Sequence, residues 1–380
     1  MALPEIQCRI ALSIIPGIGP IKARRLVENY GSAAKLFTDR SRVLNLKGKS
    51  GAILLRHIRS SEVLDQARKE MNYAASRGIR ILCFDHKDFP SLLLSCPDAP
   101  FILYVRGDIS LNNAHSLSVV GTRRASSYGR DMCQKIIGEL GAALPALLVV
   151  SGLAYGIDIM AHRAALDMGL PTIAVLAHGF EYLYPAKHRE TAEHISRHGA
   201  LITDFISSTK PERNNFLRRN RIIAGFSPAT LVVESARTGG ALVTARQALE
   251  YNRDVLAVPG RTSDVVSQGC NRLIASNRAA LTESGGDVLY HLNWNGPGEG
   301  NIEKEKALTL MPNEKILLRC LGYSPGLHPD ELSGLTGLPM NLLLELLLEL
   351  ELKDWIHMDP GMRYSMNPCY LTLLKDIDKR

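Results

Sequence analysis

The most informative segment of the chain is residues 213–221, which hold four arginines, three asparagines and one phenylalanine. The apolar residues that follow, 222–225, are typical of a helix running into a core. Guanidinium groups match phosphate oxygens with paired hydrogen bonds. An aromatic ring offers a stacking surface that any unpaired base can use. The mixture therefore predicts a groove that follows a single nucleic-acid strand, with these candidate contacts: Arg213, Asn214, Phe216, Arg218, Arg219, Asn220 and Arg221.

A second marked segment, Gly121-Thr122-Arg123, directly follows an expected strand at 117–120. Gly121 allows close approach of the backbone, and Thr122 and Ser126 are residues that cap a following helix. The N-terminus of a helix attracts anions, and Arg123 adds a formal positive charge. An exposed arginine beside a capping turn is the simpler explanation, but the combination favours an anion-binding loop.

Two more loops follow expected strands in the same way. In the first, Ser151 and Gly152 precede a helix that carries Asp158 and His162 four residues apart, on one helix face. These two residues are conceivable as a catalytic acid–base pair, although a capping acid and a partly buried imidazole are more common. The other loop contains Gly239 and Gly240, with Thr244 in the helix beyond them, and resembles a phosphate cradle.

The elements that position these loops alternate between strand and helix. Strands are expected at 79–84, 101–106, 117–120, 147–150, 172–176, 200–203, 230–234 and 255–258, with helical spacing at 128–144 and 156–168. Nearly continuous aliphatic runs are typical of strands buried on both faces of a parallel sheet. The fold class predicted is therefore α/β, a Rossmann-like doubly wound and mostly parallel sheet. Ligands of such sheets bind outside the carboxyl ends of the strands, where the four loops lie.

Flanking segments predict two further domains. Residues 1–75 are helical in pattern, and the Pro-Gly-Ile-Gly-Pro turn at 16–20 is typical of a helix-hairpin-helix. The same glycines suit an ordinary tight turn between helices, so DNA contact there stays open. Residues 76–290 form the α/β domain, and 291–308 resemble a linker. Residues 309–380 predict three helices and a two-stranded wing, at 355–358 and 363–366, which is a winged-helix pattern.

Composition sets limits on the function. The 380 residues carry a formal charge of +7, which fits a polyanionic partner. Seven scattered cysteines without a Cys-x-x-Cys spacing predict reduced thiols, a cytoplasmic protein and no zinc ribbon. No signal peptide or membrane-spanning run is evident. Neither a P-loop nor a Gly-x-Gly-x-x-Gly motif follows the first strand, so no cofactor is expected, and no metal site either.

Taken together, these motifs closely resemble those of the DprA/Smf family (DNA processing protein A). The matching residues are Gly121-Thr122-Arg123, 151–158, Ala161-His162, Tyr184-Pro185, 214–224, Gly239-Gly240, Thr244, 258–260 and 269–274. The resemblance implies a SAM-like helical domain, an extended Rossmann-like core and a DML1-like winged helix. It implies a cytoplasmic homodimer that binds single-stranded DNA, without ATP, and loads the RecA recombinase on incoming strands during natural transformation. It places DNA contacts at Gly121, Thr122, Arg123, Arg213 and Phe216. The family often has lysine at the position of Arg213, where the charge is retained.

Two other functions remain open. Rossmann-like phosphoribohydrolases of the lysine-decarboxylase-like type use a glycine-rich loop followed by a catalytic glutamate. Here Gln247 stands at that position, and an amide cannot act as a general base, so Glu234 would have to reach the same pocket. A transcriptional regulator acting through the winged helix is the other alternative. Its candidate recognition helix, 341–351, has three acids and no base, which instead predicts contact with protein.

Overall fold

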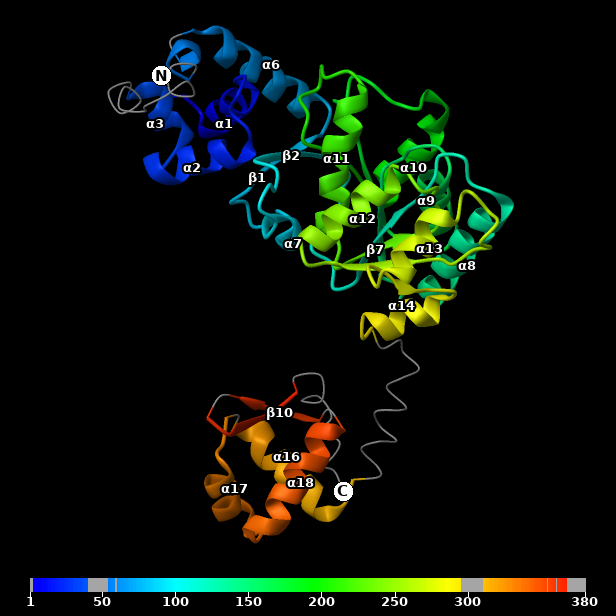
Figure 1. Ribbon diagram of the computed structural model, residues 1–380. Coiled ribbons are helices and arrows are strands. Elements are labelled where there is room, and N and C mark those ends of the chain that lie inside the picture. The colour runs from blue at the N-terminus through cyan, green and yellow to red at the C-terminus, as the bar shows by residue number, and fades with distance from the viewer. Residues whose placement is uncertain are drawn as a thin grey trace. The chain divides into compact units, whose positions relative to one another are not determined.

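A computed structural model describes residues 3–39, 54–58, 60–294, 310–324, 326–353, 355–359 and 361–367. The chain divides into two compact units, Met1–Trp294 and Asn295–Arg380. Each unit has its own hydrophobic core, and each is described separately here. Figure 1 shows the elements of both units.

The first unit is built on one sheet, in which the described residues contribute nine strands. Their order across the sheet is β1-β2-β6-β5-β4-β3-β7-β8-β9, and all neighbours from β6 to β9 are parallel. The pairs β1–β2 and β2–β6 are antiparallel. The strands are β1 Arg80–Cys83, β2 Ile102–Arg106, β3 Ser116–Val120, β4 Leu148–Ser151, β5 Thr172–Val175, β6 Ala200–Thr203, β7 Ala229–Val232, β8 Asp254–Ala257 and β9 Ala280–Leu281.

Helices cover both faces of this sheet, because successive apolar residues of each central strand point to opposite sides. In β4, Val149 packs with the helices α8 (Ser127–Ala143) and α9 (Ile157–Asp167), whereas Leu148 and Val150 pack with α11 (Arg213–Phe226) and α12 (Ala241–Glu250). Figure 1 shows α11 and α12 side by side on one face. Further helices are α7 Ser91–Leu94, η1 Ala186–His188, α10 Arg189–His198, α13 Gln268–Ala275 and α14 Gly285–His291.

The N-terminal helices pack against the antiparallel end of the sheet. They are α1 Glu5–Ile14, α2 Pro20–Tyr30, α3 Ala33–Thr38 and α6 Glu62–Ser76. Their core is shared with Phe101, Ile102 and Tyr104 of the β2 region. The turn between α1 and α2 contains Gly17 at a φ of +79°, which glycine adopts without strain. The helix-hairpin-helix pattern is therefore present, within the same compact unit as the sheet.

The second unit is a small helical domain with a wing. Helices α16 (Pro312–Tyr323), α17 (Pro329–Thr336) and α18 (Met340–Leu352) enclose a leucine-rich core with Trp355. The antiparallel pair β10 (Ile356–Asp359) and β11 (Arg363–Met366) follows. Leu327, which precedes α17, forms an isolated antiparallel bridge with Tyr364 of β11. This is the winged-helix arrangement that the sequence predicts.

The fold class predicted from the sequence is confirmed, and the eight expected strands are present to within two residues at each end. The short edge strand β9 was not predicted. The domain limits 1–75, 76–290 and 309–380 stay predictions, and most of the expected linker 291–308 lies outside the described residues. In the described part of the chain, six cysteines are unpaired, as expected for reduced thiols. Among the same residues, no helix is both long and apolar enough to cross a lipid bilayer.

Candidate nucleic-acid interface

A groove opens where the strand order of the sheet reverses. The chain runs from β3 to β4, β5 and β6 on one side, and β7, β8 and β9 lie on the other side of β3. The loops that follow β3 and β7 therefore diverge, and a crevice forms at the carboxyl ends of these strands. This groove has a volume of about 680 Å³. Of the predicted contacts, the following line it: Gly121, Thr122, Arg123, Arg213, Phe216, Arg219, Asn220, Gly239, Gly240 and Thr244.

The loop after β3 is fixed from below by a buried glutamate. Glu234, which is 1% exposed, accepts hydrogen bonds from the backbone nitrogen and the hydroxyl of Ser126, at 2.9 and 2.6 Å. Ser126 in turn caps α8 by accepting from the Gly129 nitrogen at 3.1 Å. Ser126 therefore caps the helix as predicted. The loop is rigidly held, so Arg123, which is exposed, extends from a fixed base into the groove.

Close packing between the loops after β3 and β4 explains the glycine at position 156. The Ile157 nitrogen donates to the Thr122 oxygen at 3.1 Å, so the two loops touch through their backbones. Gly156 has a φ of +78°, and a Cβ atom there would lie 2.0 Å from the Thr122 oxygen. Only glycine fits such an approach. The groove wall thus depends on a backbone contact between two consecutive loops of the sheet.

Phe216 lies at the centre of a cluster of rings and guanidinium groups. The guanidinium carbon of Arg123 lies 5.1 Å from the centre of the Phe216 ring, and that of Arg219 lies 5.9 Å from it. The Tyr184 ring meets the Phe216 ring edge to face, at 5.6 Å between centres. Tyr184 is 41% exposed, so this cluster presents an aromatic surface beside positive charge. Tyr184 was not among the predicted contacts, although an exposed ring in a loop after β5 belongs to the same edge of the sheet.

The floor of the groove contains a buried pair of opposite charges. Arg219 is 3% exposed and donates to the carbonyl oxygens of Gly152 and Val175 at 2.7 and 2.5 Å. Burial lowers the pKa of Arg219 to about 10, and the nearby Asp158 opposes that shift. Burial also raises the pKa of Asp158, against the effects of Arg219 and of the Ala154 nitrogen. Arg219 thus remains positively charged at neutral pH, while Asp158 offsets its charge.

The opposite wall of the groove is the start of α12. Gly239 and Gly240 precede this helix, and their carbonyl oxygens accept hydrogen bonds from the Leu242 and Val243 nitrogens, each at 3.1 Å. A Cβ atom at Gly240 would meet nothing within 4 Å, so this side of the groove is open. Thr244 lies one turn further and is 1% exposed. A helix start of this kind attracts a phosphate through its dipole.

Several predicted contacts lie elsewhere. The hydroxyl of Ser151 is fully buried and donates to the Val119 oxygen at 2.6 Å. Gly152 lies under Arg219, whose Nη1 would be 2.1 Å from a Cβ atom at this glycine. Asn214 is exposed in the first turn of α11 but does not line the groove. These residues support the groove or flank it.

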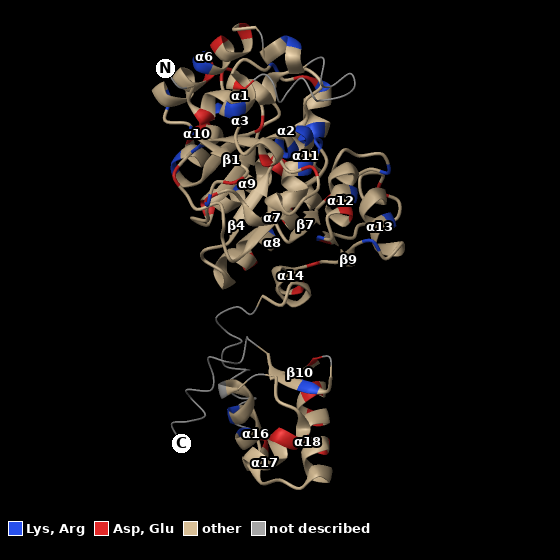
Figure 2. Ribbon diagram, turned by 90° about the vertical axis from the view of Figure 1, so that its left-hand side faces the viewer, with Lys and Arg blue, Asp and Glu red and all other residues tan. Residues whose placement is uncertain are grey.

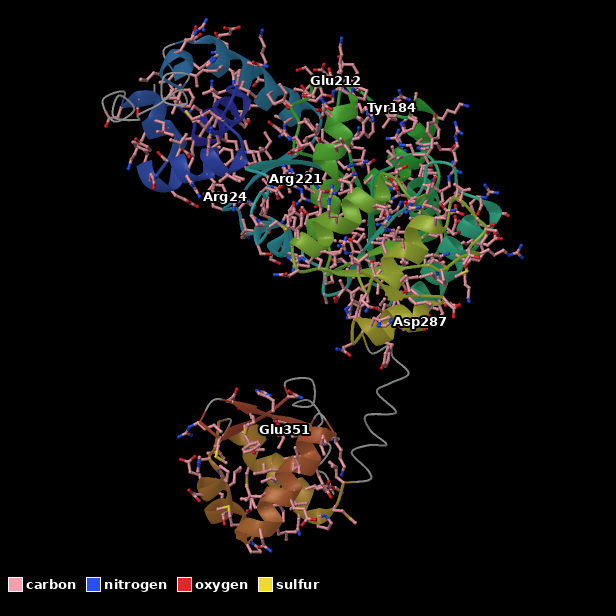
Figure 3. The ribbon with its side chains drawn as sticks, in the orientation of Figure 1. Arg24, Tyr184, Glu212, Arg221, Asp287 and Glu351 are labelled. Carbon is pink, nitrogen blue, oxygen red and sulfur yellow. The ribbon has the colours of Figure 1, made fainter. Side chains whose placement is uncertain are left out.

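Arg218 and Arg221 are both bound to Asp204. The same carboxylate oxygen accepts from Arg218 at 3.1 Å and from Arg221 at 2.6 Å. Arg221 is 6% exposed and also donates to the Asp98 oxygen. In Figure 3, Arg221 lies along α11 away from the end where Glu212 and Tyr184 lie. The two arginines point the same way, as their spacing predicts, but toward Asp204 and not into the groove, which neither of them lines.

The residues considered for catalysis have other partners. His162 is fully buried and bonds through Nδ1 to the Thr172 hydroxyl at 2.7 Å, while Asp158 accepts from the Ala154 nitrogen at 3.4 Å. Glu234, the acid that the hydrolase interpretation requires, binds Ser126 and does not line the groove. The groove therefore provides charge and stacking surfaces, and its acid, Asp158, is buried and accepts a hydrogen bond from the Ala154 nitrogen.

Comparison with known proteins gives the family. A family model described as DNA recombination-mediator protein A matches residues 80–293, and a model described as DprA winged helix domain matches residues 303–362. Protein Smf of Synechocystis is 30% identical over 400 residues, which cover 96% of this chain and all of the relative.

Two crystal structures support the same grouping. DNA processing protein A of Streptococcus pneumoniae superposes with a TM-score of 0.62 at 29% identity, over 76% of this chain and 93% of that one. DNA processing protein A of Helicobacter pylori, described for its single-stranded DNA binding mode, has a TM-score of 0.51 at 25% identity, over 56% of this chain and 95% of that one. Because one family model covers more than half of the chain and one relative aligns with nearly all of it, the chain belongs to the family of DNA recombination-mediator protein A.

Proposed function

We propose that the groove at the strand-order reversal binds single-stranded DNA. The observation that carries this proposal is the cluster of Phe216, Tyr184 and Arg123 at a fixed, exposed position beside the start of α12. The ring of Phe216 stacks on a base, which contributes about 1–3 kcal/mol and is tolerant of sequence. The Helicobacter pylori relative, which is described as binding single-stranded DNA, supports the same ligand for this chain.

Phosphates are bound on both sides of the stacked base. Arg123 and Arg213 are exposed at the groove and neutralise neighbouring phosphates, while the dipole at the start of α12 attracts a third. Gly121, Thr122, Asn220, Gly239, Gly240 and Thr244 complete the contact surface. Affinity falls with salt, with a log–log slope of about −0.7 for each phosphate neutralised on a single strand.

The bound strand is presented to a recombinase and is not cleaved. The family description as a recombination mediator supports a role together with a recombinase. The proposed role is to load RecA on the strand, as a homodimer and without ATP, during natural transformation. The groove's acid, Asp158, is buried and accepts from the Ala154 nitrogen, which supports a role in binding over one in bond breaking. Incubation of the pure protein with nucleoside monophosphates tests the hydrolase alternative. Release of free base would support hydrolysis.

The main test compares single-stranded with double-stranded oligonucleotides of equal length at low salt, by fluorescence anisotropy. We expect tighter binding of the single strand. Arg123→Ala and Phe216→Ala each weaken it by about 1–3 kcal/mol, without loss of folded structure. Arg124→Ala is the matched control, because Arg124 is adjacent and exposed but does not line the groove. Normal binding by the Arg123→Ala/Phe216→Ala double variant would contradict the site.

A further inference from the structure

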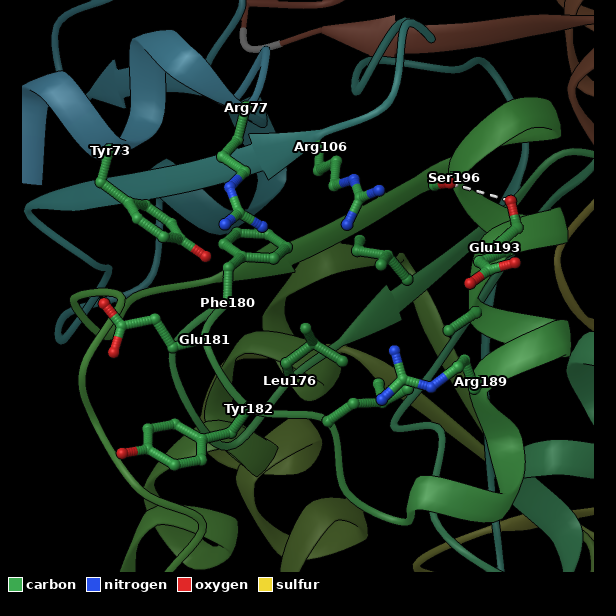
Figure 4. Close-up of a pocket in the computed structure, with 13 residues that line it drawn as sticks. Tyr73, Arg77, Arg106, Leu176, Phe180, Glu181, Tyr182, Arg189, Glu193 and Ser196 are labelled. Carbon is green, nitrogen blue, oxygen red and sulfur yellow. Dashed lines mark hydrogen bonds between the residues drawn. The ribbon is translucent and has the colours of Figure 1, made fainter.

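A second pocket lies beside the groove, on the other side of the loop that carries Tyr184. Its volume is about 380 Å³, and it lies among α6, the end of β2, α10 and the segment 180–183. Figure 4 shows Arg106 and Arg189 turned toward one open space above Leu176, with Tyr73 and Phe180 across from them. Arg77 enters from the end of α6, so three guanidinium groups from three different elements meet here.

The arginines of this pocket make no ion pair with any described residue. In the described part of the chain, ion pairs engage Arg9, Arg68, Arg218, Arg221, Arg246 and Arg363, but none engages Arg77, Arg106 or Arg189. Two acids also line the pocket. Of these, Glu181 accepts from the Ser207 hydroxyl at 3.1 Å, and Glu193 makes no ion pair with another residue that the structure describes. Three positive charges against two negative ones leave an excess that suits a ligand with one anionic group.

Aromatic side chains give the pocket a second kind of recognition. The rings of Tyr73, Phe180 and Tyr182 line it, and the guanidinium carbon of Arg77 lies 5.1 Å from the centre of the Tyr73 ring. A ring that already faces a cation suits a flat, polarisable group such as a nucleobase. Carboxylates such as Glu193 accept hydrogen bonds from base N–H groups. An acidic peptide would use the arginines but would leave the rings and the acids unused.

The pocket is continuous with the groove along the chain. Tyr182 lines the pocket and Tyr184 lines the groove, and these residues are two positions apart, so their Cα atoms lie at most about 7 Å from each other. The pocket is therefore close enough to receive the next part of a strand that leaves the groove past Tyr184.

We infer that the pocket formed by Tyr73, Arg77, Arg106, Phe180, Tyr182 and Arg189 binds one nucleotide, with its phosphate on Arg106 and Arg189 and its base on the aromatic rings. The inference extends the proposed function, because the nucleotide belongs either to the strand held in the groove or to a free nucleoside monophosphate. Both have the same chemistry, a phosphate joined to a base.

The test uses the full-length protein with the double variant Arg106→Ala/Arg189→Ala. Its matched control is Arg197→Ala, which removes an exposed arginine from α10 that does not line the pocket. Labelled single-stranded oligonucleotides of about 4 to 16 nucleotides, the usual range of site sizes, are titrated at two salt concentrations. In a second arm, dAMP alone is titrated by calorimetry.

If the nucleotide in the pocket belongs to the strand held in the groove, the double variant binds long oligonucleotides about tenfold more weakly than wild type. It binds the shortest ones equally well, because these fill only the groove. The salt slope for long oligonucleotides becomes shallower by about 0.7 for each phosphate lost. Glu193→Gln, which removes a negative charge, strengthens binding of the long oligonucleotides. For free nucleotide as the source, only the dAMP affinity falls in the double variant.

Equal affinities of wild type and the double variant for every oligonucleotide and for dAMP would overturn the inference. That result leaves the groove untouched, because Arg123→Ala and Phe216→Ala act on the shortest oligonucleotides as well. Loss of binding by the Arg197→Ala control to the same degree as by the double variant would also overturn it, since the effect would then be one of net charge.

Discussion

Within nine residues of α11, the same side-chain type has three different surroundings. Arg213 is exposed at the groove, Arg219 is buried in its floor, and Arg221 is buried against Asp204. Only an exposed guanidinium can exchange water for a phosphate. A buried one has already exchanged water for carbonyl and carboxylate oxygens, so its loss affects folding before it affects binding. Substitutions at these three positions therefore measure different quantities.

The contact between Asp204 and its two arginines gives a prediction about stability. The Asp204 side chain is 3% exposed, and the Arg221 side chain is 7% exposed. Asp204→Asn leaves a buried guanidinium without its counter-charge, which destabilises the protein by about 3–5 kcal/mol. Urea unfolding measures this loss. Arg218→Ala is the control, because that side chain is 50% exposed and its ion pair contributes less than about 1 kcal/mol.

Single-strand affinity separates the two roles of this contact. The folded fraction of Asp204→Asn is expected to bind DNA as wild type does, because Asp204 does not line the groove. If Asp204→Asn kept the stability of wild type but bound single-stranded DNA more weakly, Arg218 or Arg221 would instead contact DNA.

His162 gives a prediction about pH. Burial lowers its pKa to about 3, and its Nε2 atom has no hydrogen-bond partner. The unfolded chain takes up this proton near pH 6.5, so stability declines as pH falls from about 6.5 toward 3. Between pH 7.5 and 5.5 the expected loss from this residue is about 1.4 kcal/mol. His162→Gln removes this pH-dependent loss of stability. The free energies of unfolding of wild type and variant, measured at pH 7.5 and 5.5, give the contribution of His162. Parallel pH dependences would contradict the prediction.

At the scale of elements, the spacing within α11 contains more information than its composition. Arg219 lies three, four and seven residues before Ile222, Ile223 and Phe226, so helical periodicity places it on the buried face. The composition of 213–221 predicts positive charge correctly, but only the periodicity separates Arg213 from Arg219. Arg221 is different, because its burial depends on Asp204, which belongs to another part of the chain.

For the strands as well, local sequence patterns predict only the features that do not depend on distant parts of the chain. Buried aliphatic runs predict the parallel strands, since each is covered by helices on both faces. The antiparallel pairing of β2 with β6 and the short strand β9 depend on neighbours in the sheet, and no local pattern specifies those neighbours. The three glycine-marked loops and the arginine-rich segment could be placed at one edge in advance. The contact between Tyr184 and Phe216 could not, because it depends on how the loop after β5 meets the first turns of α11.

The start of α12 allows binding to be changed without changing the fold. Gly240 lines the groove with a φ of −61°, and a Cβ atom there meets nothing within 4 Å. Gly240→Glu places a carboxylate where a phosphate is proposed to bind, and an acid at a helix start does not destabilise the helix. We expect weaker single-strand binding, by about tenfold, at unchanged stability. Anisotropy and urea unfolding measure the two effects.

Gly156→Ala is the opposite case and serves as the contrast. Its φ of +78° and ψ of −126° are strained for any other residue, and the added Cβ atom collides with the Thr122 oxygen. It is expected to lose about 1–3 kcal/mol or more of stability. If Gly240→Glu lost as much stability as Gly156→Ala, its weaker DNA binding would be explained by impaired folding.

At the scale of the whole molecule, charge is unevenly divided between the two units. In Figure 2, α18 carries acidic residues, all of them glutamates, and no Lys or Arg. The exposed leucines Leu344, Leu348 and Leu352 lie on the same helix, at a spacing of four. A phosphate backbone is repelled by such a surface, whereas a protein partner can cover its leucines. The second unit therefore fits a role in contact with protein.

Removal of residues 309–380 tests this division of roles. The first unit has its own cores and contains the whole groove, so the truncated protein should stay folded and bind single-stranded DNA within tenfold of the full chain. Its salt slope should be unchanged, because the lost unit neutralises no phosphate in this scheme. Anisotropy at two salt concentrations gives both values, and Arg123→Ala in the truncated protein checks that the same groove is used. A loss of more than tenfold together with a shallower slope would mean that the winged helix itself holds phosphates, and its acidic helix would then face away from the strand.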